Sequence, residues 1–171
     1  MEFQQATLQD LPQLAKIMSE AIHLLQIQGS PQWQDGYGPT TEKLTADIKN
    51  KATYVLRTDT NEIAGTIALI TGIDPAYTEI SEGDWLKTNS AYLSFHRVAI
   101  NQKFTGQKIA QQLIEHAIVE SRKKGFRDLR IDTHELNHAM QKVINQTGFF
   151  YRGIVLFPIP NGTRLAYQRI I

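Results

Sequence analysis

The sequence contains no cysteine in 171 residues, which excludes disulfide bonds, a thiolate nucleophile and cysteine-ligated metal sites. It also lacks any run near the roughly 18 consecutive apolar residues that a membrane-spanning helix requires. The first residues, MEFQQATLQDLPQL, show neither the basic nor the apolar region of a signal peptide. We therefore expect a cytoplasmic protein with no membrane partner.

The sequence also has no marked excess of positive or negative charge. The 18 basic residues are offset by 17 acidic ones and are spread along the chain, so the formal net charge of +1 does not favour a nucleic-acid partner. A composition with 42% hydrophobic and 20% charged residues is typical of a soluble globular protein. Because there is no repeat, low-complexity tract or linker, we expect one domain over residues 1–171.

Hydrophobic periodicity predicts alternating helices and strands. Apolar residues at helical spacing predict amphipathic helices over residues 10–27 and 109–123, with shorter helices after the loop at 29–41 and at about 137–146. β-Branched runs predict strands at 53–58, 62–70, 91–100, 129–133, 149–157 and 163–171, the first two as a hairpin. Residues 74–89 are acidic and are expected to leave the sheet. The order of elements predicts a mixed α/β (α+β) sheet with helices on its faces.

The most informative stretch is VAINQKFTGQKIAQQLI, in which a strand ends, a polar loop follows and a helix begins. The first turn of a helix has unpaired N–H groups and a partial positive charge, so it can bind a pyrophosphate. Gly106 allows the backbone to approach a ligand closely. Neither GxxxxGK[ST] nor GxGxxG occurs, so the loop is not a Walker or dinucleotide loop.

Residues 105–110 resemble the acetyl-CoA pyrophosphate loop of GNAT acyltransferases, whose pattern is roughly Arg/Gln-x-x-Gly-x-Gly/Ala. Ala110 matches the last position, whereas Thr105 stands for the usual Arg or Gln and Lys108 for the central Gly. At the expected distance, Asn137 opens a helix that ends at the sequence GFF, which resembles the family's Asn-x-x-Ala…Gly-Phe segment. The order of strands resembles the family over most of the chain.

The resemblance implies a mostly antiparallel sheet of six to seven strands with helices on both faces. It implies an N-acetyltransferase that moves an acetyl group from acetyl-CoA to a primary amine by direct attack in a ternary complex, and it leaves a homodimer open. The implied cofactor contacts are Val98, Ala99, Ile100, Thr105, Gly106, Gln107, Lys108, Ile109, Ala110 and, for the pantetheine arm, Asn137.

Neither of the family's usual proton-transfer residues is in place. Tyr92 occupies the strand position where some members have a glutamate base, and Ile144 occupies the helix position of a tyrosine acid. Because strand residues alternate, Tyr92, Ser94 and His96 share one face, which makes His96 a candidate base or relay.

Asp132 and His134 on the neighbouring strand compete with His96 for this role, and Tyr151 is a candidate acid for the departing thiolate. For each of these residues a purely structural role is the alternative. Trp33 and Tyr37, together with the acidic stretch 74–84, are candidates for binding a cationic amine through cation–π contact and electrostatic steering. The alternative for them is a core anchor and a solvated loop.

Two other functions remain to be weighed. HELNH at residues 134–138 is an H-E-x-x-H sequence, which on a helix would hold zinc in a metallopeptidase. However, the preceding residues alternate as a strand, and no Asp, Glu, His or Cys follows between 139 and 171, so we expect no metal. The degenerate loop also allows an acyl-CoA-binding sensor without catalysis, which detectable acetyl transfer or hydrolysis would exclude.

Overall fold

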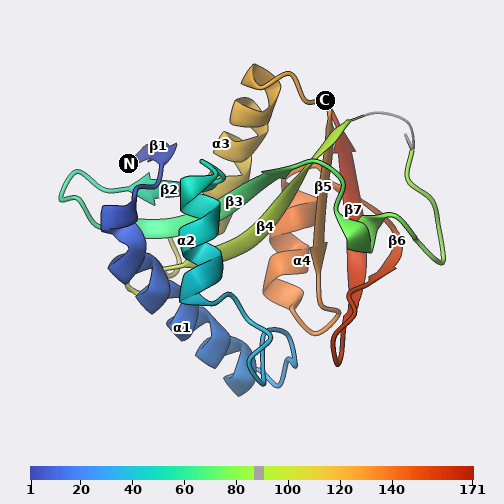
Figure 1. The fold of residues 1–171 in the computed structure, drawn as a ribbon, viewed down its shortest axis with the longest axis horizontal. Coiled ribbons are helices and arrows are strands. Elements are labelled where there is room, and N and C mark those ends of the chain that lie inside the picture. Colours follow the sequence, from blue (N-terminus) through green and yellow to red (C-terminus); the bar gives the residue numbers. More distant parts are fainter. Residues whose placement is uncertain (87–90) are drawn as a thin grey trace.

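The computed structural model describes residues 1–86 and 91–171 (Figure 1). In these residues, seven strands form one sheet in the order β1-β2-β3-β4-β5-β7-β6. The strands are β1 (Glu2–Gln5), β2 (Thr53–Arg57), β3 (Ile63–Thr71), β4 (Tyr92–Ile100), β5 (Asp128–Thr133), β6 (Phe150–Leu156) and β7 (Thr163–Ile170). The α-helices are α1 (Leu11–Ile27), α2 (Thr41–Lys49), α3 (Ile109–Lys123) and α4 (His138–Gln146).

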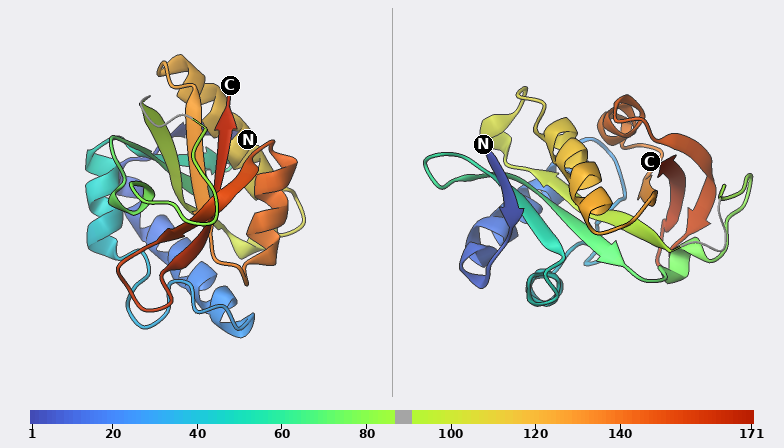
Figure 2. Two further views of the ribbon diagram at one scale, coloured as in Figure 1. Left: turned by 90° about the vertical axis from the view of Figure 1, so that its right-hand side faces the viewer. Right: turned by 90° about the horizontal axis from the view of Figure 1, so that it is seen from above.

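Adjacent strands are antiparallel except β4 and β5, which are parallel. The helices cover both faces, with α1 and α2 on one side of the sheet and α3 and α4 on the other (Figure 2). This architecture confirms the mixed, mostly antiparallel sheet of six to seven strands. The hairpin of β2 and β3 and the helices α3 and α4 also lie where the sequence pattern predicts them.

Strand β1 was not predicted. Its sequence, EFQQ, has a single apolar residue, Phe3, so it shows no alternation that a sequence pattern could detect. The strand forms because its four residues pair with β2, from Glu2 opposite Arg57 to Gln5 opposite Tyr54. A contact between distant parts of the chain therefore decides its conformation.

The core has one large cluster on each helix-covered face. Apolar residues of α3, such as Leu113 and Ile114, pack on one face of the sheet, and Leu14 and Ile17 of α1 pack on the other. A Cβ on Gly65 of β3 would lie 2.8 Å from Cγ2 of Ile109 and 2.8 Å from Cδ1 of Leu113. Each such fully buried side chain contributes about 1.5–3 kcal/mol. This close packing holds the N-terminus of α3 beside the sheet.

The connection between β3 and β4 leaves the sheet, as its acidic composition predicts, and residues 87–89 of that stretch lie outside the described residues. It contains a short 3-10 helix, η2 (Pro75–Tyr77), which Asp74 caps by accepting a bond from the Ala76 amide at 3.0 Å. Tyr77 and Trp85 are buried against β6 and β7. The connection is therefore a packed cover over the sheet.

A bulge in β4 separates this strand from β5. Ala68 of β3 pairs with His96 and Thr66 pairs with Ala99, so Arg97 and Val98 together face one residue of β3. Arg97 has a left-handed φ of 52°. Pairing of β4 with β5 ends at Phe95 and Ile131, although both strands continue. The two strands consequently diverge beyond that point, as Figure 1 shows.

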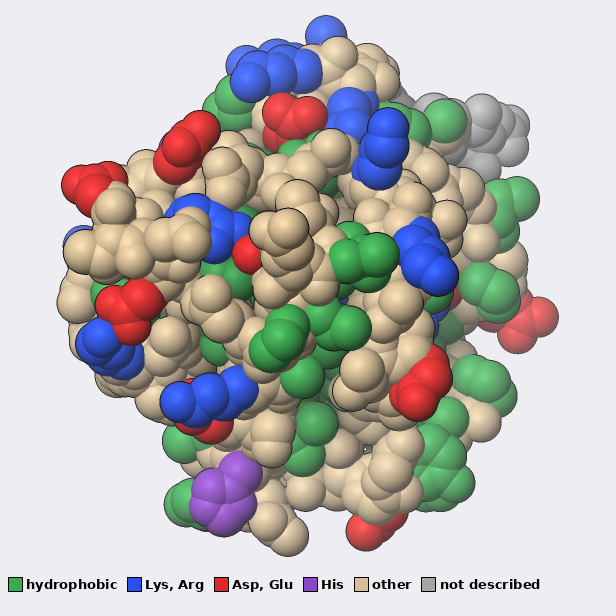
Figure 3. Space-filling view, turned by 60° about the vertical axis from the view of Figure 1, so that its left-hand side comes forward, with side chains coloured by type: hydrophobic (Ala, Val, Ile, Leu, Met, Phe, Trp, Pro, Cys, Tyr) green, Lys and Arg blue, Asp and Glu red, His purple; other side chains and the backbone are tan. Residues whose placement is uncertain are grey.

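The face drawn in Figure 3 carries charges of both signs. On the face drawn in Figure 3, basic and acidic side chains are interspersed, and hydrophobic ones gather near its centre. In the described part of the chain, no helix combines the length and apolar character needed to cross a bilayer.

Candidate functional site

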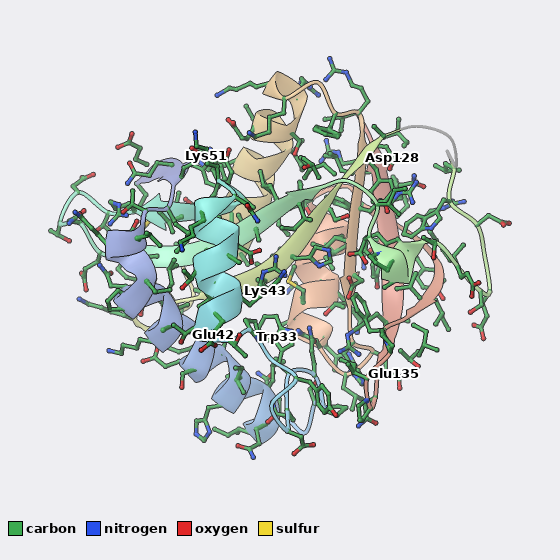
Figure 4. All side chains as sticks on the ribbon, viewed as in Figure 1. Trp33, Glu42, Lys43, Lys51, Asp128 and Glu135 are labelled. Carbon is green, nitrogen blue, oxygen red and sulfur yellow. The ribbon has the colours of Figure 1, made fainter. Side chains whose placement is uncertain are left out.

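A cavity of about 330 Å³ lies where β4 and β5 diverge. Its walls are residues 96–100 of β4, 131–133 of β5, the first turns of α4, the end of α1 with the loop after it, and the tip of the β6–β7 hairpin. Figure 4 shows Trp33 and Glu135 at the end of the molecule where β5 finishes, and Asp128 at the opposite end where β5 begins. The cavity thus occupies the carboxyl end of the parallel strand pair.

A hydrogen-bonded cluster surrounds His96 at this cavity. His96 Nε2 lies 2.9 Å from Oδ2 of Asp74, and His96 Nδ1 lies 3.9 Å from Oδ2 of Asp132. The hydroxyl of Tyr77 donates to the same Asp132 oxygen at 2.6 Å. The Asp74 amide donates to the hydroxyl of Tyr92 at 2.7 Å. The imidazole is therefore held between two carboxylates that come from different elements.

These two carboxylates differ in acidity. Burial raises the pKa of Asp132, against the opposing effects of His96, the Tyr77 hydrogen bond and Arg164. Burial also acts to raise the pKa of Asp74, but the hydrogen bond and charge of His96 and the Ala76 amide outweigh it and hold that pKa below its usual range. Burial, with the charge of Asp132, raises the pKa of Tyr77 well above its ordinary value, so its hydroxyl stays protonated.

The hydrogen bond to Asp74 determines which ring nitrogen of His96 carries a proton. Because an ionised carboxylate only accepts hydrogen bonds, Nε2 of His96 must donate to Asp74. In the neutral ring this leaves Nδ1, on the Asp132 side, with a free lone pair. The cluster can therefore take up a proton at Nδ1 of His96.

The candidate proton-transfer residues do not all reach the cavity. His96 and Asp132 line it. His134 does not, because it is 6% exposed and its Nδ1 accepts a bond from the Leu136 amide at 3.1 Å in the turn after β5. Tyr151 does not either, since β6 lies beyond β7 at the sheet edge and the ring, 46% exposed, packs edge-on against Tyr167.

The loop before α3 has the geometry of an anion site. Gly106 has a φ of 84° and Lys108 one of 56°, and a Cβ on Gly106 would meet no atom within 4 Å. Among the described residues, no backbone acceptor is found for the amides of Gly106, Lys108 or Ile109. Free amides over open space at a helix N-terminus fit a pyrophosphate.

The other residues expected to contact a cofactor lie beside this loop. Val98, Ala99, Ile100, Ala110 and Asn137 line the cavity, while residues 105–108 form the loop before α3 and Ile109 begins the helix. Beyond Phe95, the edge of β4 that faces β5 has no strand partner among the described strands, which leaves backbone groups available to an extended ligand. These features fit a phosphate group with a long arm.

Asn137 and the two aromatic residues of the α1–α2 loop come together at the cavity. The Oδ1 of Asn137 accepts from the Met140 amide at 3.2 Å and so caps α4, while its Nδ2 donates to Oε1 of Gln32 at 3.2 Å. Trp33 and Tyr37 also line the cavity. Asn137 is far from Trp33 and Tyr37 in the sequence, and the fold brings the three residues to one cavity.

The HELNH motif does not lie on a helix. β5 ends at Thr133 and α4 begins at His138, so the motif spans the connection between a strand and a helix. Among the described residues, no group of three His, Asp or Glu side chains could hold a metal ion.

Several contacts of the site were not predicted from the sequence, although the acidic stretch 74–84 was a candidate for steering a cationic amine. Asp74 and Tyr77 lie in the acidic connection, and no local pattern indicates that they reach His96 and Asp132. Arg97 lies next to His96 at the bulge, and its Nε is 2.7 Å from Oδ2 of Asp47 in α2. Only contacts between distant elements identify these residues.

Comparison with known proteins agrees with this geometry. The sequence model of the Acetyltransferase (GNAT) family matches residues 18–149. A crystal structure of a GNAT-family acetyltransferase from Streptococcus agalactiae 2603 has a TM-score of 0.91 and 34% identity, over 99% of this chain and 95% of that chain. Among functionally curated proteins, none matches the chain.

Two more distant structures share the fold. A GNAT-family acetyltransferase from Listeria monocytogenes 4b F2365 has a TM-score of 0.78 and 20% identity, over 99% of this chain and 94% of that chain. The PaiA N-acetyltransferase from Thermoplasma acidophilum, in complex with coenzyme A, has a TM-score of 0.70 and 18% identity, over 99% and 98% of the two chains.

Proposed function

Because the chain belongs to the GNAT acetyltransferase family, we propose that it transfers an acetyl group from acetyl-CoA to a primary amine in a ternary complex. One observation carries the proposal beyond the family. A histidine held between two carboxylates lines a cavity that opens beside a helix N-terminus suited to phosphate. The site therefore combines a proton acceptor with a place for the acyl donor.

The donor would be held by two sets of groups. The free amides at the start of α3, around Gly106 and Lys108, would bind the pyrophosphate of acetyl-CoA. The unpaired edge of β4 over residues 98–100, with Asn137 opposite, would bind the arm. When bound, acetyl-CoA supplies an activated acyl carbon. The coenzyme A complex of the Thermoplasma protein supports this choice of donor.

The residues around His96 would handle the proton of the acceptor. An amine with a pKa near 10.4 is mostly protonated at pH 7, and neutralising it costs about 4–5 kcal/mol. Asp74 keeps the proton of His96 on Nε2, so Nδ1 accepts a proton from the amine directly or through one water. Tyr77 keeps Asp132 in place by donating to it. His96 is thus the proposed base, and Asp74 positions it.

Thermal unfolding with and without acetyl-CoA tests the donor. A ligand at 100 times its dissociation constant stabilises the native state by about 2.7 kcal/mol, which corresponds to roughly 5–10 °C for a domain of this size. We expect such a shift with acetyl-CoA and with free CoA, and none with NAD as the control. The absence of a shift with acetyl-CoA would overturn the proposal.

A transfer assay then separates an acyltransferase from a sensor. Amines are supplied together with acetyl-CoA, and the release of the free thiol is followed with a colorimetric reagent. We expect release that depends on an amine. Stabilisation by acetyl-CoA without amine-dependent release would favour an acyl-CoA-binding sensor instead.

A further inference from the structure

The loop between α1 and α2 holds an aromatic residue in a strained backbone conformation at the cavity. Trp33 has a φ of 64°, in the left-handed region that bulky residues rarely adopt. It nevertheless lines the cavity and packs against the core on the α1 side. Such strain persists only where the surroundings enforce it, and it gathers at ligand sites.

The surroundings of Trp33 do enforce this conformation. Nε2 of Gln34 donates to the carbonyl oxygens of Ile22 and Gln32, at 3.0 Å each. The Nδ2 of Asn137 holds Oε1 of Gln32 from the side of α4. A Cβ on Gly38 would lie 2.9 Å from the Trp33 carbonyl oxygen, so the loop is tightly folded. The loop is therefore a built wall of the cavity.

Besides Gln28 and Gln32, the lining near the end of α1 and in the loop after it is apolar or aromatic, and the tip of the β6–β7 hairpin adds further apolar side chains. Tyr37 comes from the same loop, Leu24 from α1, and Phe157 and Ile159 from the connection between β6 and β7. These side chains would contact the body of a bound molecule that enters between the loop and the hairpin. They offer dispersion and ring stacking rather than hydrogen bonds.

Charged groups are few in the cavity, and each of its two arginines has a carboxylate within 4.0 Å, although Nη2 of Arg97 has no hydrogen-bond partner among the described residues. Among the described lining residues, Asp132 is the single carboxylate. Arg97 is ion-paired with Asp47 of α2 at 2.7 Å. Nη1 of Arg164 donates to the carbonyl oxygens of Asn161 and Thr163, and its Nε is 4.0 Å from Asp132. The cavity thus offers one carboxylate to an amino group and, among the described lining residues, none to a second amino group.

The volume limits the size of the acceptor. The cavity of about 330 Å³ is at the small end for small-molecule sites. The side formed by Val98, Ala110, Met140 and Val143 belongs to the proposed donor. The remaining space admits a compact molecule.

We infer that the acceptor is a compact primary monoamine, whose apolar or aromatic body packs against Trp33, Tyr37 and Phe157 while its amino group reaches His96 and Asp132. This inference rests on the proposed function. Polyamines and amino acids would each place an additional charge against the apolar wall, where desolvation opposes binding.

A set of three amines of equal chain length tests the class. Hexylamine, 1,6-diaminohexane and 6-aminohexanoate differ only in whether the far end is apolar, cationic or anionic. At saturating acetyl-CoA, we expect kcat/KM for hexylamine to exceed that of the other two by about tenfold or more, because only its far end is free of charge. 2-Phenylethylamine should be acetylated at least as well as hexylamine.

Two variants test the wall. Trp33→Ala and Tyr37→Ala should each raise KM for hexylamine by about tenfold, because each removes the ring that packs on the amine body. KM for acetyl-CoA should stay within about twofold. Phe150→Ala is the control, since Phe150 is aromatic, 71% exposed on β6 and outside the cavity lining. Should Trp33→Ala not fold, Tyr37→Ala, at a position 49% exposed, still decides the point.

The outcomes separate the two proposals. Acetylation that favours the diamine or the amino acid, or wall variants with an unchanged KM for hexylamine, would overturn the acceptor class and leave the acetyltransferase proposal standing. Stabilisation by acetyl-CoA with no amine acetylated would overturn both.

Discussion

The orientation of His96 and the position of its ring proton depend on the neighbouring carboxylates. Asp74 contacts it from the connection after β3, and Asp132 faces it from β5. The first carboxylate has a lowered pKa and the second a raised one, although both are largely buried. The difference arises because Asp74 makes the closer contact with the imidazole and also accepts the Ala76 amide. The pair orients the ring and leaves one nitrogen open to a proton.

Replacement of His96 tests its role as the base. His96→Ala should lower kcat by about 10²–10⁴, the usual contribution of a positioned base. KM for acetyl-CoA should change little, because the proposed donor contacts lie on β4 beyond the bulge and on α3. Steady-state kinetics with hexylamine measures both. His23→Ala, at an exposed histidine of α1, serves as the control. An unchanged kcat in His96→Ala would make His96 a structural residue.

The two carboxylates should affect stability with opposite sign. Because the pKa of Asp74 is lowered in the folded state, its ionised form stabilises the protein above its unfolded pKa, and that contribution is lost as the pH falls through the folded pKa. We expect Asp74→Asn to lower the free energy of unfolding at pH 7, and to lower it less at about pH 3. Urea denaturation at the two pH values measures the difference.

Asp132→Asn is the matched comparison. The pKa of the Asp132 carboxyl is raised in the folded state, so ionisation of Asp132 costs stability as the pH rises through the folded pKa. This variant should therefore be at least as stable as the original chain at pH 7. A destabilisation like that of Asp74→Asn would show that Asp132 contributes mainly as an ion-pair partner of Arg164 and His96.

At the scale of elements, the start of α3 and the separation of β4 from β5 form the proposed donor site. α3 is held against β3 by the contacts around Gly65, and the bulge at Arg97 turns β4 away from β5. The ion pair of Arg97 with Asp47 joins the bulge to α2. One helix end and one strand edge thus face the same space.

The two glycines at the ends of α3 allow a matched test. Gly106 and Gly125 have φ values of 84° and 85°, and neither would place a Cβ within 4 Å of another atom. Alanine at either position should cost roughly 1–2 kcal/mol of stability, because a left-handed conformation strains any L-residue with a Cβ. Only Gly106→Ala should weaken acetyl-CoA binding, since its methyl group enters the proposed phosphate space.

Calorimetric titration with CoA measures this difference. Gly106→Pro should abolish binding altogether, because proline lacks an N–H and cannot adopt a positive φ. Equal affinities in Gly106→Ala and Gly125→Ala, or full affinity in Gly106→Pro, would place the phosphates elsewhere.

For the whole molecule, one continuous sheet joins all the packed elements. The cluster under α1 and α2, the cluster under α3 and α4, and the cluster around Tyr77 share strands of the same sheet. Figure 2 shows no part of the described chain that stands apart from this sheet. We propose that residues 1–171 form one folding domain.

Urea unfolding tests this proposal with two local probes. Trp33 lies against the core under α1 and α2, whereas Trp85 lies in the cluster with Val155 and Ala166. Fluorescence of the single-tryptophan variants Trp33→Phe and Trp85→Phe should each give a midpoint that coincides with that of the far-ultraviolet circular dichroism of the same variant. Midpoints that differ within one variant would indicate more than one cooperative unit.

Much of the fold could be predicted because its signals are local. The apolar stripe of α3, the turn between β2 and β3 and the capping residue Asn137 each act within a few residues of the chain. β1 could not be predicted, because its four residues become a strand only through pairing with β2. Structure that depends on a pattern within one element can be predicted from the sequence, whereas pairing between distant segments cannot.

The same distinction between local patterns and distant contacts applies to the residues of the site. Strand alternation predicts the face of β4 on which His96 lies, but it does not predict the cavity, which consecutive residues 95–100 line; the strand–loop–helix junction predicts the place of Gly106 before α3. Tyr151 lies away from the cavity because β6 is at the sheet edge beyond β7, and the sequence around GFF does not reveal this position. The acidic stretch that contains Asp74 was a candidate for steering an amine, but the contact of Asp74 with His96 was not predicted because it joins two elements that lie apart in the chain.

The sequence by itself determined the class of fold, the strand–loop–helix junction at α3 and the family to which both point. These depend on periodicity, turn chemistry and unpaired amides of a helix start, which are properties of short segments. Only the tertiary structure decided that Asp74 and Asp132 flank His96 and that Trp33 faces the same cavity. Burial, and with it the acidity of each carboxylate, depends on the neighbours that distant parts of the chain provide.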